Sequence, residues 1–292
     1  FFIPQEDEFS RKTPPLTVNA QSEFLQQAVL ELTGHKISGQ ETIPIHEACV
    51  SGLTGLSLAA QRIRRGIWKN AVVVGVDLRC SPLDLMRFHA LGALTTQPAE
   101  GASCPFSKER SGFVRSQGAG AFLLQSDPHT EPWGEIAGFG QTNDAWRLTE
   151  GRADGHGAVT AIKRALDMSE MKAHDIDAFS AHATSTLAGD VLEVRAIKQV
   201  WQESAGRLPV TALKSQIGHA GQAAGLLQMA SALIMLKEQC LAPTINYRTP
   251  DPKCDLDFVP NSSRRKTLRA ILCNATAFGG QNAALVVKGV KC

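Results

Sequence analysis

The sequence predicts an α/β fold built on a mostly parallel sheet, and three observations favour it. Short apolar runs of strand length alternate with segments whose apolar residues recur at helical spacing. This alternation continues along most of the 292 residues, as expected when helices connect parallel strands. Two passages also share one plan, in which a strand leads through a reactive side chain and small residues into a helix, and this is a weak sign of internal duplication.

The pattern begins again after Asp127-Pro128, which divides the chain into an expected amino-terminal half, residues 1–127, and a carboxyl-terminal half, residues 128–292. Because residues 71–76 form a short apolar run, we expect that strand to be buried on both faces. Residues 92–116 are rich in Gly, Pro, Ser and charge, and a loop of that length favours a functional role. The other elements expected in the first half are helices at 23–32, 51–65 and 82–89, a strand ending at His46, and a strand at 118–125.

The second half repeats the alternation of strands and helices. Its expected strands lie at 133–140, 177–182, 208–213, 257–259, 268–275 and 283–288. Its expected helices lie at 157–168, 188–201 and 221–238.

Composition excludes several classes of protein. The net charge is only +2, with Lys and Arg scattered, so a nucleic-acid arm or a polybasic membrane anchor is not expected. Seven widely spaced cysteines without a C-x-x-C pair favour reduced thiols in a cytoplasm over disulfides or zinc. The apolar runs are well short of the ~20 residues that span a bilayer. We therefore predict a cytoplasmic protein with no metal, no membrane segment and no nucleic-acid partner.

Cys49 is a candidate covalent catalyst. It is expected at a sharp turn between the strand ending at His46 and the helix at 51–65. The positive end of that helix lowers the pKa of a thiol and favours the nucleophilic thiolate. The alternative is a structural cysteine, because free cysteine is among the most buried residue types. A zinc site with His46 would need two further ligands, and none is near in sequence.

Three further stretches, 182–190, 214–225 and 274–282, place reactive residues among small ones. His182 ends a strand and is expected to face a cavity, where Thr184 and Thr186 can hydrogen-bond the loop. His219 stands beside glycines at a helix start, where the dipole keeps its imidazole neutral. Either histidine alone could instead satisfy a core hydrogen bond, and residues 218–225 lack the Gly-Lys-Ser/Thr of a phosphate-binding loop.

In the last stretch, glycines such as Gly279 allow a backbone amide to approach a ligand, and Phe278 can stand as a gate. Taken together, the motifs resemble the β-ketoacyl-acyl carrier protein synthases, in particular the elongating enzymes with a Cys-His-His triad. The resemblance extends from about residue 43 to residue 290. Its segments are, in order, Ala48-Cys49-x-Ser-Gly, the loop 105–114, His182-x-Thr-Ser-Thr-x-x-Gly-Asp190, Lys214-Ser-x-x-Gly-His219-x-x-x-Ala-Ala-Gly225, Pro243-Thr-Ile-Asn246, 254–260 and Phe278-Gly-Gly280.

The resemblance implies a thiolase-like layered α-β-α fold of two similar halves, with the amino-terminal half incomplete. It also implies acyl transfer to Cys49 followed by decarboxylative condensation. His182 and His219 would bind the thioester carbonyl of malonyl carrier protein and stabilise the enolate. Lys214, paired with Glu193, would give electrostatic support. The N–H groups of Cys49 and Phe278 would form the oxyanion hole, and Phe278 with Phe88 would occupy the gate positions.

The implied partners are acyl carrier protein and a second condensing-enzyme subunit, in a homodimer or a heterodimer, and no cofactor is implied. Two alternatives stay open, a non-catalytic partner subunit that sets chain length and a thiolase-type acyltransferase that uses Cys273 as its base. Fewer residues precede Cys49 than the family usually carries, so we expect a fragment or a half completed by another polypeptide. The sequence departs from the family pattern at Ser111, at Ala183, in the stretch 274–277 and at Gln281, and the added methyl groups of Ala183 and Ala277 bear on acyl specificity.

Overall fold

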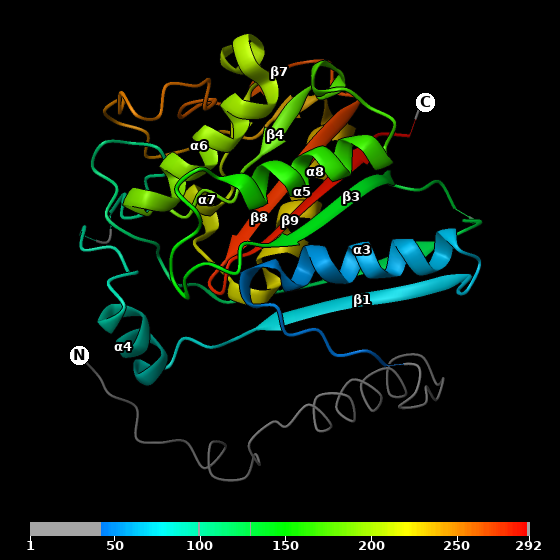
Figure 1. Ribbon diagram of the computed structural model, residues 1–292, viewed down its shortest axis with the longest axis horizontal. Coiled ribbons are helices and arrows are strands. Elements are labelled where there is room, and N and C mark those ends of the chain that lie inside the picture. Colours follow the sequence, from blue (N-terminus) through cyan, green and yellow to red (C-terminus); the bar gives the residue numbers. More distant parts are fainter. Residues whose placement is uncertain (1–41, 99, 129, 291–292) are drawn as a thin grey trace. The chain divides into compact units, whose positions relative to one another are not determined.

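A computed structural model describes residues 42–98, 100–128 and 130–290 (Figure 1). Contacts divide the chain into residues 1–46 and residues 47–292. Residues 42–46 of the first unit contain no strand, so the predicted strand ending at His46 was wrong. Pro44 accounts for this, because it removes a backbone donor from the middle of the short run. The helix predicted at 23–32 lies outside the described residues.

The second unit contains an antiparallel pair of strands, β1 (Asn70–Asp77) and β2 (Gly118–Gln125). One face packs inward through Val73, Phe122 and Leu124. The other face is exposed along β1 at alternate residues. The prediction of a strand in a parallel sheet, buried on both faces, was therefore wrong. An apolar run does not by itself reveal which neighbour a strand pairs with.

A five-stranded sheet follows in the order β3-β9-β8-β4-β5. β9 is antiparallel to β3 and β8, whereas β4 is parallel to β8 and β5, so the sheet is mixed and not mostly parallel as predicted. Residues 257–259 form no strand, and only Asp257 among them forms an isolated bridge. The strand bounds are β3 Glu135–Asn143, β4 Ala178–Ser180, β5 Val210–Thr211, β8 Ala270–Ala277 and β9 Gln281–Lys288, with a separate pair β6 Cys240–Leu241 and β7 Arg264–Arg265.

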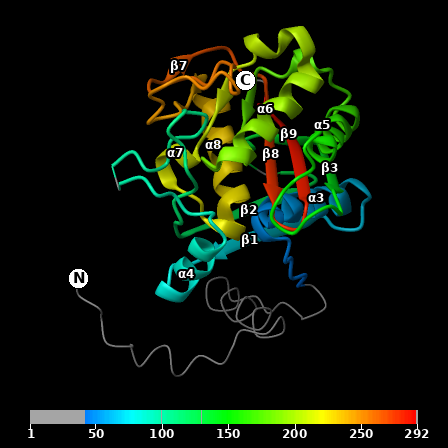
Figure 2. The ribbon, with the colours of Figure 1, turned by 60° about the vertical axis from the view of Figure 1, so that its left-hand side comes forward.

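Helices α3 (Ser51–Arg64) and α8 (Ala224–Glu238) contact both sheets and form a layer between them (Figures 1 and 2). Helix α5 (His156–Met168) covers the opposite face of the five-stranded sheet and packs against α6 (Leu187–Trp201). The core consists of two hydrophobic clusters, one on each face of the five-stranded sheet. Successive side chains of β8 point into them in turn, since Leu272 belongs to one cluster and Ile271 and Cys273 belong to the other. The strands and helices thus form the layered α/β architecture that the sequence predicts.

The remaining helices are short or peripheral. Helix α4 (Pro82–Ala90) begins with a capping box between Ser81 and Asp84, and none of its residues is buried. The others are η2 Ala48–Val50, η3 Ala173–Asp175, η4 Gln202–Arg207, α7 Lys214–Ile217 and η5 Gly221–Ala223. Among the described residues, no helix combines the length and the apolarity that crossing a membrane requires.

Helices α3 and α8 cross where two glycines meet. A Cβ atom on Gly52 would lie 2.8 Å from the backbone N of Leu226, and one on Gly225 would lie 2.7 Å from the backbone N of Leu53. Only glycine permits this approach. The turns η2 and η5, which precede the two helices, are consequently in contact. The fold therefore brings Cys49 in η2 beside the segment that follows His219.

Candidate active site

Cys49 lies in the tight turn η2, immediately before α3. Ala48 has a left-handed φ of 47°, a conformation that costs a non-glycine residue free energy. The Ser51 hydroxyl stabilises the turn, since it donates to the Ala48 carbonyl at 2.8 Å and accepts from the Glu47 N–H at 2.9 Å. These local bonds hold the cysteine at the start of the helix, where the sequence predicts it.

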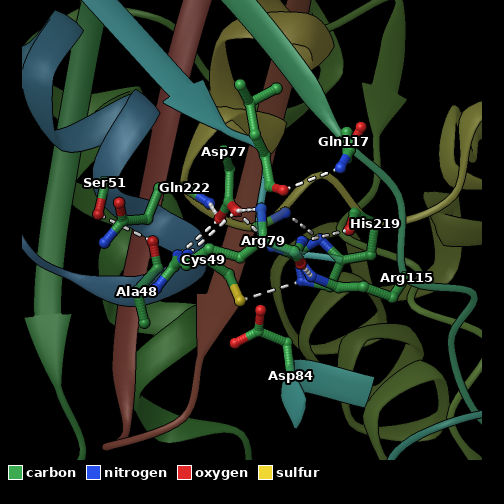
Figure 3. A network of polar contacts seen from close by, with 12 residues as sticks. Ala48, Cys49, Ser51, Asp77, Arg79, Asp84, Arg115, Gln117, His219 and Gln222 are labelled. Carbon is green, nitrogen blue, oxygen red and sulfur yellow. Dashed lines mark hydrogen bonds and ion pairs between the residues drawn. The ribbon is translucent and has the colours of Figure 1, made fainter. Parts of the chain in front are cut away.

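The imidazole of His219 contacts the Cys49 thiol directly. Its Nε2 lies 3.0 Å from Cys49 Sγ (Figure 3). The backbone N–H of Gly221 donates to Nδ1 over 3.2 Å. A neutral ring that accepts at Nδ1 carries its proton on Nε2. His219 is therefore arranged to donate a hydrogen bond toward the sulfur.

Burial favours the uncharged forms of both groups. Desolvation raises the pKa of Cys49 to about 11, and the charges of Lys214 and Arg115 only partly oppose this. The predicted lowering of the thiol pKa by the helix was therefore wrong, because the loss of water outweighs the positive surroundings. Desolvation, followed by Lys214 and Arg115, lowers the pKa of His219 well below its usual value, so the ring is neutral as predicted.

His182 is the second imidazole of the site. Its ring stands perpendicular to that of His219, with 5.5 Å between the ring centroids. Lys214 Nζ donates to the His182 carbonyl at 2.6 Å and lies 3.5 Å from His182 Nδ1. An ammonium has only donors, so Nδ1 accepts and the His182 proton resides on Nε2. Desolvation and then Lys214 lower the pKa of His182, which also favours a neutral ring.

Glu193 supports the backbone of the His182 loop. Its two carboxylate oxygens accept from the N–H groups of His182 at 2.7 Å and Ala183 at 2.8 Å, and Asn274 Nδ2 donates to it at 2.6 Å. Within the described part of the chain, no ion pair joins Glu193 to Lys214; the Glu193 charge acts on Lys214 only through space. Desolvation is the larger influence and lowers the pKa of Lys214 to about 8. The predicted pairing is thus electrostatic, without a direct bond.

The two threonines lie in the turn that enters α6. Thr184 Oγ1 and Thr186 Oγ1 are 3.0 Å apart, and Thr186 caps the helix by accepting from the Gly189 N–H at 3.2 Å. Ala183 has a φ of 40°, a conformation that favours glycine. The turn is therefore held by hydroxyl contacts and by the Glu193 carboxylate.

Aromatic side chains form a row beside His219. The Phe113 ring packs edge to face on His219 and on Phe88, with 5.3 Å between centroids in each case. Phe88 therefore contacts Phe113, which in turn contacts His219. Phe278 follows β8, which packs against η2, and it is 37% exposed. Gly279, with φ 88°, donates its N–H to the Leu148 carbonyl at 2.7 Å. The oxyanion-hole and gate roles stay predictions.

Sequence reasoning missed a charged cluster behind the histidine, formed by Asp77, Arg79 and Arg115 (Figure 3). Desolvation alone would raise the pKa of Asp77, but hydrogen bonds from Arg79 and from the Gln222 N–H, with the nearby charge of Arg115, lower it to about 2. One signal was visible in the sequence, because Asp77 ends an otherwise apolar strand. Arg115 stands one residue beyond the 105–114 motif.

Comparison with known proteins identifies the family. Residues 39–129 match the model of the β-ketoacyl synthase N-terminal domain, and residues 133–248 match that of the C-terminal domain. The 3-oxoacyl-[acyl-carrier-protein] synthase 2 of Coxiella burnetii is 35% identical over 279 residues, which cover 91% of this chain and 67% of that protein. The Staphylococcus aureus enzyme of the same name is 34% identical over 82% of this chain and 61% of its own length. The chain thus spans about two thirds, or less, of these relatives.

Solved structures agree with this result. A type II polyketide synthase acyl-carrier protein in complex with its ketosynthase matches with a TM-score of 0.86 and 32% identity, over 94% of this chain and 69% of that chain. The ishigamide ketosynthase/chain length factor matches with a TM-score of 0.77 and 31% identity, over 84% of this chain and 60% of that chain. The chain therefore belongs to the β-ketoacyl synthase family and has its thiolase-like fold.

Proposed function

We propose that the chain provides the catalytic centre of a ketosynthase, which loads an acyl group onto Cys49 and condenses it with malonyl carrier protein. The observation that carries this proposal is the 3.0 Å contact between Cys49 Sγ and His219 Nε2, with the His182 ring 5.5 Å from that of His219. One thiol and two neutral imidazoles are the groups that acyl transfer and enolate stabilisation require.

In the loading step, Cys49 sulfur attacks the thioester carbonyl of acyl carrier protein. A carbon–sulfur bond forms to Cys49, the bond to the phosphopantetheine sulfur breaks, and the proton of the Cys49 thiol goes to that leaving sulfur. With Nε2 protonated, His219 donates a hydrogen bond that stabilises negative charge developing on the Cys49 sulfur. This contact compensates for a thiol whose pKa is about 11.

In the condensation step, the malonyl thioester carbonyl accepts from the Nε2–H groups of His182 and His219. Carbon dioxide leaves, and the electron pair of the broken carbon–carbon bond forms an enolate. The enolate carbon attacks the acyl carbonyl on Cys49, and the Cys49 sulfur departs. The N–H groups of Cys49 and Phe278 are proposed to bind the intermediate oxyanion, a contact worth roughly 3–4 kcal/mol per donor.

The proposal also covers the two halves of the chain, the gate residues, the partners and the location. Residues 1–127 and 128–292 correspond to the two family halves, as the change of matched domain between residues 129 and 133 supports. Phe88 and Phe278 act as the gate. The proposed partners are acyl carrier protein and a second condensing-enzyme subunit, since solved relatives are complexes of ketosynthases with such proteins. The proposed location is the cytoplasm.

The two alternatives fit the site less well. A non-catalytic partner subunit has no need of a nucleophile, whereas Cys49 and both histidines are assembled here. A thiolase needs a second reactive cysteine, and the candidate Cys273 is fully buried on β8 among apolar side chains. Burial raises the pKa of Cys273 to about 12, which disfavours its use as a base.

Acyl loading tests the proposal. Incubation of the full-length protein with acyl carrier protein that carries an acyl thioester should add the mass of one acyl group at Cys49, which peptide mass spectrometry can locate. Cys49→Ala should abolish this addition, and Cys80→Ala, which removes a partly exposed cysteine elsewhere, should retain it. The variant His182→Ala/His219→Ala should load more slowly but measurably, because the hydrogen bond to the Cys49 sulfur is lost, and should lose malonyl decarboxylation. Acylation at another residue, or its complete absence in folded protein, would refute the function.

A further inference from the structure

Asp77, at the end of β1, is the centre of a buried charged cluster (Figure 3). Its side chain is inaccessible to solvent, and it accepts hydrogen bonds from both Arg79 and Arg115. The Arg115 side chain is only 3% exposed. A buried ion pair of this kind forms a rigid unit, because breaking it leaves a charge without water or a partner.

This pair binds both ends of the turn that contains His219. Arg115 Nη1 donates to the His219 carbonyl at 2.8 Å. Asp77 Oδ2 accepts from the Gln222 N–H at 3.0 Å. The turn between these points, residues 219–222, is thereby fixed to β1 and to the segment before β2.

Gly221 lies directly against the ion pair. A Cβ atom on Gly221 would lie 2.0 Å from Asp77 Oδ2 and 2.8 Å from Arg115 Nη1, and its φ of 51° also favours glycine. The N–H of this same residue donates to Nδ1 of His219. Together with the backbone bonds of His219 to Val114 and Ser116, the ion pair therefore holds the donor that determines which ring nitrogen carries the proton.

The choice of nitrogen decides what His219 can do. With Gly221 as donor to Nδ1, the proton on Nε2 faces Cys49. If the turn rotated and the donor were lost, the proton could occupy Nδ1, and a lone pair would then face the sulfur. A ring in that tautomer cannot donate to a thiolate or to a thioester oxygen.

We propose that Asp77 and Arg115 are positioning residues that hold the 219–222 turn and so keep the proton of His219 on Nε2, facing Cys49. The contribution of this tautomer to catalysis rests on the proposed ketosynthase function. The tautomer itself does not, because it is a property of the protein without substrate.

Arg79 provides a matched control. It binds the same carboxylate through Nε at 3.1 Å and Nη2 at 2.6 Å, and it carries the same charge as Arg115. Its side chain is 58% exposed, and its guanidinium makes no hydrogen bond to the 219–222 turn among the described residues. Replacing it changes the charge of the cluster and leaves the Arg115 contact to the His219 carbonyl in place.

The test is the tautomer of His219, read from long-range ¹H–¹⁵N correlation spectra of ¹⁵N-labelled full-length protein, with His219→Asn to assign the signals. Wild type and Arg79→Met should show unprotonated Nδ1 and protonated Nε2. Arg115→Met should shift the Nδ1 signal toward the protonated position. Arg115→Lys, which keeps a cation for Asp77 but not the forked guanidinium, should give an intermediate shift. This variant decides the matter if Arg115→Met does not fold.

Activity provides an independent measurement. In carrier-protein assays, Arg115→Met should slow malonyl decarboxylation roughly tenfold to a hundredfold, the scale expected for a misplaced catalytic group. A wild-type tautomer in both Arg115 variants would overturn the proposal whatever the activity. If wild type itself fails to load or condense, the ketosynthase function is wrong, while the tautomer measurement still decides the role of Asp77 and Arg115.

Discussion

At the scale of single residues, burial controls the chemistry of the site. Desolvation is the largest influence on Cys49, His182, His219 and Lys214, and it favours the neutral form of each. Neutral imidazoles can still donate hydrogen bonds from the protonated ring nitrogen. Lys214 is the group whose lowered pKa, about 8, falls near physiological pH.

Lys214 gives a prediction for the reactivity of Cys49. Below pH 8 its ammonium is charged and lowers the pKa of the thiol, and above pH 8 this effect fades. Lys214→Met should therefore slow alkylation of Cys49 by iodoacetamide roughly tenfold at pH 7, since a lost neighbouring charge shifts a pKa by about one unit. The difference should shrink above pH 8. Lys163→Met, on the exposed face of α5, is the control, and equal rates for Lys214→Met and wild type at pH 7 would contradict the coupling.

Sequence reasoning located the reactive residues but not their electrostatics. Cys49, His182 and His219 are recognisable because their neighbours are small residues at characteristic spacing. The pKa of Cys49 was predicted in the wrong direction, because a helix start is visible in sequence whereas the amount of water around a side chain is not. Asp77 and Arg115 were missed for a similar reason, since they meet the 219–222 turn only through tertiary contacts.

At the scale of elements, the loop 105–114 connects the site to α6. Arg110 is its anchor, with a side chain that is only 2% exposed. It binds Asp251 at 2.6 Å and lies 3.8 Å from Asp190. Asp190 in turn accepts from the N–H groups of Phe106 and Ser185, and so joins the loop to the turn that follows His182.

Removing this anchor should destabilise the protein. Arg110→Met breaks the direct ion pair with Asp251 and removes the hydrogen bond to the Ser107 carbonyl, and breaking a buried ion pair costs about 3–5 kcal/mol. Equilibrium urea unfolding measures the loss. Arg195→Met, which removes an exposed arginine of α6, should change stability by no more than about 0.5 kcal/mol. A loss below about 1 kcal/mol for Arg110→Met would show that the loop does not depend on this residue.

The positions of the helices were predicted better than the pairing of the strands. The helices at α3, α5 and α6 begin and end within a residue or two of the expected positions, because their apolar periodicity is local. The mixed order of the five-stranded sheet was not predicted, since hydrogen bonds between distant strands leave no local pattern. Residues 257–259 have strand-like composition, but only Asp257 forms a bridge, and it is isolated.

At the scale of the whole molecule, the described residues leave one apolar face of β1 and β2 uncovered. In the register of the pair, Val72 lies opposite Leu123 and Val74 opposite Ala121. Val72 and Leu123 are each 62% exposed. Exposed apolar faces of this kind favour association in water.

Substitutions on opposite faces of β1 test this surface. Val74→Lys places a charge on the exposed face and should reduce self-association, measured by light scattering, with a change in stability of about 0.5 kcal/mol or less. Val73→Lys, one residue away, points toward the core beside α3 and should strongly destabilise the fold. Equal effects of the two variants on stability would contradict the assigned faces.

The glycine contact between α3 and α8 determines more than helix packing. Cys49 precedes Gly52 by three residues, and His219 precedes Gly225 by six. The two side chains therefore belong to two backbone segments that approach as closely as main-chain atoms allow. The two backbones cannot move closer, and there is no room for a methyl group at either glycine. The close approach of these two glycines thus limits how near Cys49 and His219 are brought to each other.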